Sequence, residues 1–564
     1  MHPDIHIDIP NVPGLITKKI VRGFTYMYYE YAREYVKEKR YTIVKRAAIG
    51  KMDANGKLVP NENFRKYLPQ FLPGEAMREQ ASSCLRVGAF FIVRKIVDDY
   101  ALTEKLLRFF EPKDAALLLD LVMYSLITEG NAAQYYPDYA YNHPVLTESM
   151  RRYSDSKVSS FLRSIKFEQT SGFLEAWNEP REKRRRIYVS YDSTNKNCQA
   201  GDIDMVEYGH AKDNRSRPVF NYSIAFDQNN REPLFYEEYP GSIVDVSQLQ
   251  YMLSKAEGYG YRNVGLILDR GYFSRANIEL MDARGIEFVI MVKGMARLVN
   301  DTVEKVRGTF ENDRDCFVRE YKAYGTTVRQ KLYDDDTRER YFHIFHRVER
   351  EYREHAALEE NLEKLNRYLE RFENSVVQIP DVVEYYFDLT FDRKGTFLYA
   401  KEKKDVIQHE LELCGYFVLI TSEEMTAAEA LNFYKGRDTS EKLFRGDKSY
   451  LGNKSLRVCS DESASAKIFI EFIALIIRNK VYNYLKNEKK ANYMTVPAAI
   501  RELEKIEMIR LADGVYALDH AVTATQKEIL RAFGLDEDFV KNEAYKLTQA
   551  ILKTENEALK NAEG

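Results

Sequence analysis

The feature that most restricts the fold is a regular succession of strand and helix patterns between residues 187 and 292. Three strand patterns come first, and two helix–strand pairs follow. Asp245 and Ser274 are typical helix N-caps, and each predicted helix precedes a continuous apolar run that is typical of a buried strand. This succession predicts an α/β layer architecture. The predicted strands are residues 187–192, 217–226, 232–239, 264–268 and 286–292.

Composition narrows the class of protein. The chain has 564 residues, enough for about three to four domains. Its 45% hydrophobic residues, with only 27 glycines and 15 prolines, exclude a disordered or collagen-like chain. The five cysteines are scattered and form no zinc-ribbon spacing, which favours free thiols in a reducing cytosol.

No segment predicts export or membrane insertion. The first ten residues lack a basic and an apolar signal region. The longest apolar run, residues 468–477, is interrupted by Glu471 and is too short to span a bilayer. We therefore expect a cytoplasmic protein with no membrane partner. The net charge of −3 gives no overall sign of a nucleic-acid partner, so a basic surface would have to be local.

Two regions precede the α/β pattern. Residues 15–75 are rich in Tyr, Val and Ile around a turn signal at 53–56, which predicts a small β-rich unit. Residues 76–180 have apolar residues at helical spacing. Ser154 is a good N-cap there, and the helix that it opens suits either a DNA-recognition helix or an ordinary packing helix, of which the packing helix is favoured.

Residues 296–414 break the α/β pattern and are interpreted as an insertion with its own packing. A strand is expected at 341–345 and a long charged helix after it. The apolar stripe of that helix covers only about two heptads, which favours a local core over a coiled-coil dimer. The stripe comprises Leu358, Leu362, Leu365, Leu369 and Phe372.

Two aspartates lie on predicted core strands. Asp192 shares one strand face with Ser190, and Asp269 directly follows the apolar strand 264–268. Ligands of α/β sheets bind at the carboxyl ends of strands. An aspartate joined to a buried strand is costly unless it is paired or bound to a metal. For Asp269 alone, a helix N-cap or a buried pair with an arginine remains an equal alternative.

A later helix presents further charged residues at helical spacing. Tyr434, Arg437, Glu441, Arg445 and Lys448 fall on one helix face. Taken alone, this pattern favours a solvated face with Arg–Glu pairs. Two strand aspartates and one helix glutamate can, however, hold two Mg²⁺ ions, which suit an in-line phosphoryl transfer. Arg437, Arg445 and Lys448 would then hold phosphates beside the metals.

The order Asp192, Asp269, Glu441 resembles the DDE transposases of bacterial insertion sequences. The spacing Y-x2-R-x3-E-x6-K is that of the group with the tyrosine–arginine–glutamate–lysine signature, and all four residues match it. Further similar segments are 191–194, 209–218 with Lys212 and Arg215, 239–241 before Asp245, and 268–271 with Arg270. The resemblance covers residues 20–530.

The resemblance implies a ribonuclease H-like catalytic core interrupted by an α+β insertion. It implies cleavage at terminal inverted repeats and joining of 3′-hydroxyl ends to target DNA by an oligomer, usually a dimer. Asp192, Asp269 and Glu441 would hold Mg²⁺, for which Mn²⁺ can substitute. DNA binding is expected from Tyr434, Arg437, Arg445, Lys448, Lys212, Arg215 and Arg270. The resemblance also implies a bacterial protein that associates with the nucleoid when it binds DNA.

The resulting domain organisation has six segments. The flanking segments are a β-rich N-terminal unit and a helical region, both assigned to DNA binding, and a C-terminal helical region assigned to dimerisation. The boundaries are 1–75 for the β-rich unit, 76–180 for the helical region, 181–295 and 415–485 for the two parts of the core, 296–414 for the insertion and 486–564 for the C-terminal region.

Two other functions compete with an active transposase. A catalytically inactive, transposase-derived DNA-binding protein would bind DNA ends without cutting, but all three acidic residues are present. A glycoside hydrolase also uses paired carboxylates, but its cleft needs exposed aromatics and the chain has one Trp. Local charge favours DNA, because residues 181–186 and 442–457 each carry +4 beside the proposed metal ligands.

Overall fold

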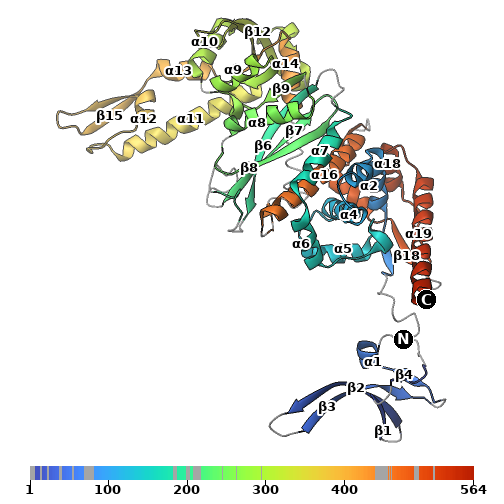
Figure 1. Cartoon of the computed structure of the whole chain (residues 1–564). Helices are drawn as coiled ribbons and strands as arrows, with labels where there is room; N and C mark the ends of the chain where they lie inside the picture. The colour runs from blue at the N-terminus through green and yellow to red at the C-terminus, as the bar shows by residue number, and fades with distance from the viewer. Residues whose placement is uncertain are drawn as a thin grey trace. The chain divides into compact units, whose positions relative to one another are not determined.

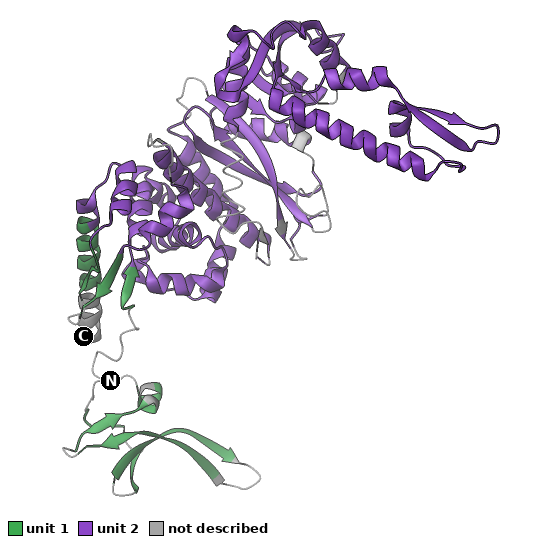
Figure 2. Ribbon diagram, turned by 180° about the vertical axis from the view of Figure 1, so that it is seen from behind, with its two compact units in different colours: residues 1–85, 507–520, 541–564 green, residues 86–506, 521–540 purple. Residues whose placement is uncertain are grey.

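The structure is a computed structural model, and the chain forms two compact units (Figures 1 and 2). The first unit comprises residues 1–85, 507–520 and 541–564, and the second comprises residues 86–506 and 521–540. The residues that the structure describes are 7–12, 15–21, 24–36, 41–53, 56–68, 71, 82–181, 187–198, 203–207, 218–243, 245–261, 263–293, 295–437, 455, 456, 458, 460–487, 494–511 and 515–563.

The first unit contains the β-rich region that the sequence predicts. Four antiparallel strands lie in the order β1-β2-β3-β4. Asp53 accepts a hydrogen bond from the Lys57 N–H at 2.8 Å and so forms the predicted turn. Ile49, Leu58 and Phe64 are fully buried against one face of the sheet. The elements are β1 (Ile16–Val21), β2 (Phe24–Val36), β3 (Tyr41–Met52), β4 (Leu58–Pro60) and α1 (Glu62–Tyr67).

A three-stranded sheet joins distant parts of the sequence. Its order is β19-β18-β5, formed by β5 (Cys84–Arg86), β18 (Glu507–Arg510) and β19 (Tyr516–Leu518). In the first unit the Thr548 hydroxyl of α19 (Glu537–Glu563) donates to the Tyr516 carbonyl oxygen at 2.8 Å. This contact attaches the C-terminal helix to the sheet.

The second unit begins with a helical region. Ser154 caps α6 as predicted, and its hydroxyl accepts from the Lys157 N–H. The helix buries Val158, Phe161 and Leu162, as expected of a packing helix. The principal helices are α2 (Gly88–Asp99), α3 (Leu102–Leu107), α4 (Pro112–Thr128), α5 (Tyr136–Asn142), α6 (Asp155–Ser164) and α7 (Phe167–Asn178).

The centre of the second unit is a mixed sheet that confirms the predicted strand succession. The five strands of that succession lie side by side in the order β10-β9-β6-β7-β8. β7 and β8 are antiparallel to their neighbours, whereas β9 and β10 run parallel to β6. The strands are β6 (Ile187–Cys198), β7 (Val219–Asp227), β8 (Glu232–Pro240), β9 (Val264–Leu268) and β10 (Glu287–Met291).

Helices cover both faces of this sheet. On one face, Gln248 of α8 (Asp245–Gly258) donates to Glu237 of β8 at 3.3 Å, and α9 (Arg275–Ala283) contacts β10. On the other face lie α14 (Ala427–Gly436) and α16 (Asp461–Asn487), whose Phe472 packs on Tyr236. The result is an α/β layer structure, as the sequence predicts.

The segment 296–414 extends the same sheet rather than packing wholly apart from it. β16 (Tyr416–Thr421) pairs with β10 on one side and with β13 (Glu339–His346) on the other. β12 (Ala323–Lys331) and β11 (Phe317–Val318) complete this edge. β13 contains the strand that was predicted at 341–345.

The predicted leucine stripe lies on α11 (Val348–Arg371) and forms a small separate core. Leu362 and Leu369 are buried against Val383, Phe387 and Phe397. This packing within one chain confirms a local core for the stripe. The elements around it are α12 (Asp381–Tyr386), β14 (Phe387–Phe391), β15 (Phe397–Glu402) and α13 (Lys404–Glu412). Among the described residues, no helix is both long and apolar enough to cross a membrane.

Candidate active site at the ends of two parallel strands

The register of β6 and β9 brings the two predicted aspartates together. Tyr191 of β6 is the partner of Leu268 of β9. Asp192 follows Tyr191 on β6, and Asp269 directly follows the end of β9, so their backbones lie about one interstrand spacing, roughly 4.8 Å, apart. Both strands run in the same direction, and Asp269 stands where β9 ends. The sheet therefore gathers two carboxylates at one point, as the ligand-binding edge of an α/β sheet requires.

The Asp269 carboxylate has three polar neighbours. Its Oδ1 accepts from the Arg270 N–H at 2.7 Å, which caps the short 3-10 turn Arg270–Tyr272. The Tyr434 hydroxyl donates to the same oxygen at 3.4 Å. Arg437 Nη1 lies 3.3 Å from Oδ2. Both alternatives weighed for Asp269, a cap and a pair with arginine, are thus present, and they occur beside Asp192.

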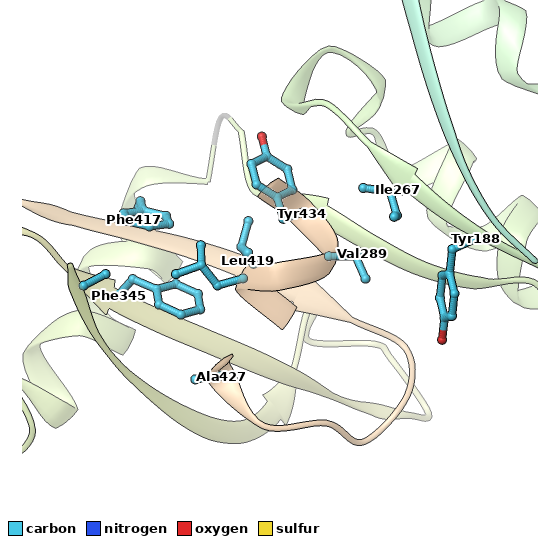
Figure 3. Packing of buried hydrophobic residues seen from close by; sticks show 10 residues of the cluster. Tyr188, Ile267, Val289, Phe345, Phe417, Leu419, Ala427 and Tyr434 are labelled. Atoms are coloured by element: carbon cyan, nitrogen blue, oxygen red, sulfur yellow. The ribbon is translucent and has the colours of Figure 1, made fainter. Parts of the chain in front are cut away.

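Helix α14 carries Tyr434 and Arg437 to this point. It begins at a capping box formed by Thr426 and Glu429, which satisfies the first backbone N–H groups. Ala430 and Leu431 are fully buried, and Tyr434 is only 5% exposed. Figure 3 shows the packed cluster around Ile267 of β9, Val289 of β10 and Tyr434. This packing fixes the end of α14 over β9, the strand that Asp269 directly follows.

The Arg437 side chain contacts both the Tyr434 ring and the Asp269 carboxylate. Its guanidinium is 5.2 Å from the centre of the Tyr434 ring and pairs with Asp269. The arginine side chain is 12% exposed, whereas that of Asp269 is 37% exposed. The carboxylate is therefore held by Arg437 on one side and accessible to solvent on the other.

The remaining predicted site residues divide into two groups. Asp192 is half-buried and accepts from the Ser193 N–H at 2.9 Å, and Arg270 is exposed. The others lie outside the described residues, and they are Lys212, Arg215, Glu441, Arg445 and Lys448.

The donor set suits a hard divalent cation. Asp192 and Asp269 supply carboxylate oxygens, which are the ligands that Mg²⁺ prefers. Within the described ranges, no group of three His, Cys, Asp or Glu residues could hold a metal ion. A third carboxylate from the chain beyond Arg437 would complete the set that the sequence predicts.

Sequence reasoning missed the buried groups that hold β6 in place. Lys196 Nζ lies 2.5 Å from Glu471 of α16, and both side chains are at most 2% exposed. On the opposite face, the Tyr191 hydroxyl donates to Glu237 at 2.5 Å, and burial raises the pKa of Tyr191 well above its usual value. The sequence did contain a sign of the buried pair, because Glu471 is an acidic residue inside an apolar run and therefore needs a partner.

The fold and the paired carboxylates define an α/β protein with an acidic site at its strand ends. The model of the transposase DDE domain family matches residues 189–477, just over half of the chain. The chain belongs to this family. The match includes Asp192, Asp269 and Glu441.

No curated protein matches the chain. Among solved structures, one similar structure is the cryo-EM structure of the piggyBac transposase synaptic complex with hairpin DNA. It is 10% identical, with a TM-score of 0.36 over 74% of this chain and 76% of that chain. At that level the likeness is coarse.

Proposed function

We propose that this protein is a DNA transposase that binds the terminal inverted repeats of a bacterial insertion sequence. It would cut the DNA by metal-dependent phosphodiester hydrolysis and join the 3′-hydroxyl ends to target DNA. The observation that carries the proposal is the adjacent position of Asp192 and Asp269 within the family-matched segment. Such a protein would act on nucleoid DNA in the cytoplasm, as a homodimer in the DNA complex.

The proposed catalytic core is ribonuclease H-like. The supporting observation is the strand order β10-β9-β6-β7-β8, in which three antiparallel strands are followed by two strands parallel to the first. The segment 296–414 would be the insertion between the second aspartate and the glutamate. It adds strands to the edge beyond β16, away from β6 and β9.

Glu441 is the proposed third ligand. It lies four residues beyond Arg437, whose guanidinium already contacts Asp269. Its spacing from Arg437 is that of the signature Y-x2-R-x3-E-x6-K. The family match over residues 189–477 includes Glu441, which supports the assignment.

The chain's own residues would prepare the site for DNA. Asp192, Asp269 and Glu441 would hold Mg²⁺, or Mn²⁺ in its place, through carboxylate oxygens. When bound, two such ions stabilise the attacking and leaving oxygens of an in-line phosphoryl transfer. Tyr434 and Arg437 orient Asp269, because they contact its two different oxygens. Arg270, Arg445, Lys448, Lys212 and Arg215 would bind phosphates.

The test is cleavage of a DNA fragment that carries the sequences flanking the gene. Wild-type protein with Mg²⁺ should nick this DNA at the element ends, and Asp192→Ala should bind it without nicking. Glu360→Ala, in the exposed pair with Lys364 on α11, is a matched acidic control that should cut normally. Equal cutting by Asp192→Ala and the control would refute the assignment. Binding without any cutting by the wild type would identify an inactive descendant.

A further inference from the structure

The four-stranded sheet of the first unit has one face that α1 does not cover. Its core face is set by Met27 of β2, which is 6% exposed and packs with Ile49 and Phe64. Side chains alternate between faces along a strand. Phe24, Tyr26 and Tyr28 therefore lie together on the opposite face, which we call the aromatic face (its strands are labelled in Figure 1).

Lysines flank these aromatic rings on both neighbouring strands. Tyr26 is directly opposite Lys19 of β1 and Lys51 of β3. Residues opposite each other in an antiparallel pair point to the same face. Lys51 Nζ lies 4.6 Å from the centre of the Phe24 ring, which places both on this face.

The aromatic face is open to solvent. Phe24 is 53% exposed, and Lys19 and Lys51 are both exposed. Within the described part of the chain, neither lysine forms an ion pair. An exposed ring with an ammonium group beside it offers a ligand both a stacking surface and positive charge.

The charge of this region selects an anionic partner. Residues 1–71 contain thirteen Lys and Arg residues against seven Asp and Glu residues, a net charge of +6, although the whole chain carries −3. A neighbouring acidic residue, Glu30, is already paired with Arg33 and Arg46. The remaining positive charge is complementary to a polyanion.

We infer that the aromatic face binds single-stranded DNA, with bases stacked on Phe24, Tyr26 and Tyr28 and phosphates held by Lys19 and Lys51. Alternate side chains on a strand are about 6.7 Å apart, roughly twice the 3.4 Å step of stacked bases. The spacing therefore lets a base lie between successive rings. Aromatic rings beside a basic groove are the usual means of binding unpaired bases without sequence preference.

The choice of DNA as the polymer rests on the proposed transposase function. Cutting and joining strands exposes unpaired nucleotides near the ends. A face that holds an unpaired strand would keep it available while the site at Asp192 and Asp269 acts on the duplex. The aromatic face and the acidic site at Asp192 and Asp269 consist of different residues. A substitution in one should therefore leave the function of the other intact.

The test uses the full-length protein and fluorescence anisotropy of a labelled 20-nucleotide strand, alone and annealed to its complement. Tyr26→Ala and Phe24→Ala should each weaken single-strand binding about tenfold and duplex binding much less. Lys19→Gln with Lys51→Gln should weaken it and reduce its salt dependence. Tyr31→Ala is the matched control, because Tyr31 is an exposed tyrosine of β2 that stacks on Tyr67 at 4.6 Å.

Circular dichroism shows whether each variant folds. Lys19 and Lys51 are exposed, so their replacement leaves the hydrophobic core intact. Equal binding by Tyr26→Ala and Tyr31→Ala, or equal losses for single strand and duplex, would overturn the inference. Tighter binding of the RNA strand of the same sequence would overturn the choice of DNA. Asp192→Ala should keep single-strand binding, so lost cleavage with intact binding separates a failure of the proposed function from a failure here.

Discussion

Two carboxylate–cation pairs on the same sheet differ in access to solvent. Lys196 and Glu471 are 2.5 Å apart and sealed between β6 and α16, with side chains 0% and 2% exposed. Asp269 and Arg437 are 3.3 Å apart, and the aspartate side chain is 37% exposed. The same chemistry therefore serves two purposes. A sealed pair can only hold the fold, whereas an accessible carboxylate can exchange its partner for a ligand.

The largest expected effect comes from breaking the sealed pair. Glu471→Ala would leave the Lys196 ammonium buried without its carboxylate partner. The free energy of unfolding should fall by about 3–5 kcal/mol. Urea denaturation followed by circular dichroism measures this change. Replacing Lys196 and Glu471 together by Met should restore much of the loss, since neither charge of this pair is then left buried without its partner.

The exposed pair Glu360–Lys364 on α11 is the control for this experiment, because both side chains are 64% exposed. Glu360→Ala should change the free energy of unfolding by less than about 1 kcal/mol. If Glu471→Ala were as mild as Glu360→Ala, the buried pair would not hold β6 against α16.

The accessible pair should affect chemistry rather than folding. Asp269→Asn keeps the size of the side chain but removes the charge that binds a cation. Cleavage should fall by more than about 100-fold, beyond the cost of losing a group that only orients a ligand. The urea midpoint should stay close to that of the wild type. A stable variant that still cuts DNA at the wild-type rate would remove Asp269 from the site.

A third carboxylate is buried like that of Glu471, but it is hydrogen-bonded to backbone N–H groups instead of paired with a cation. Asp120 of α4 is 0% exposed and accepts from the N–H groups of Leu146 and Thr147 at 2.6 and 3.1 Å. Burial raises the pKa of Asp120 to about 7. The folded state therefore keeps a proton that the unfolded state loses above its usual pKa of 3.8.

The resulting stabilisation is fully present below pH 3.8 and is lost as the pH rises through about 7. Its slope is at most roughly 1.4 kcal/mol per pH unit. Asp120→Asn should flatten the pH dependence of the urea midpoint between about pH 5 and 7, a range that lies between the unfolded and folded pKa values of Asp120. Parallel curves for variant and wild type would show that Asp120 does not titrate in this range.

The smallest effect is expected at the Tyr434 hydroxyl. Tyr434→Phe removes the 3.4 Å hydrogen bond to Asp269 but keeps the ring in its cluster. Stability should change by about 1 kcal/mol or less, and cleavage should fall only a few-fold. A loss as large as that of Asp269→Asn would instead mean that the hydroxyl acts on the DNA directly.

Local patterns predicted the strands and helix starts well. Residues 264–268 were expected as a buried strand, and β9 has those bounds. Ser274 accepts from the Asn277 N–H at the start of α9, as its N-cap pattern indicated. Such features depend on alternation and capping among neighbouring residues, so the sequence contains what is needed to predict them.

Tertiary packing changed the reading of several residues. Tyr434 was placed on a charged helix face, yet it is 5% exposed because α14 lies across β9 and β10. Residues 296–414 were interpreted as packing by themselves, yet β11, β12 and β13 extend the central sheet. Strand pairing over such distances depends on partners that no local pattern specifies.

The sequence by itself determined the α/β succession, the two strand aspartates and the spacing of the signature around Glu441. Only the tertiary structure decided that Asp192 and Asp269 are neighbours, and that Arg437 pairs with Asp269 while Lys196 pairs with Glu471. The physical reason is that strand register and helix docking are fixed by burial of apolar surface across the whole sheet. Charged side chains then pair with whichever groups that packing brings within reach.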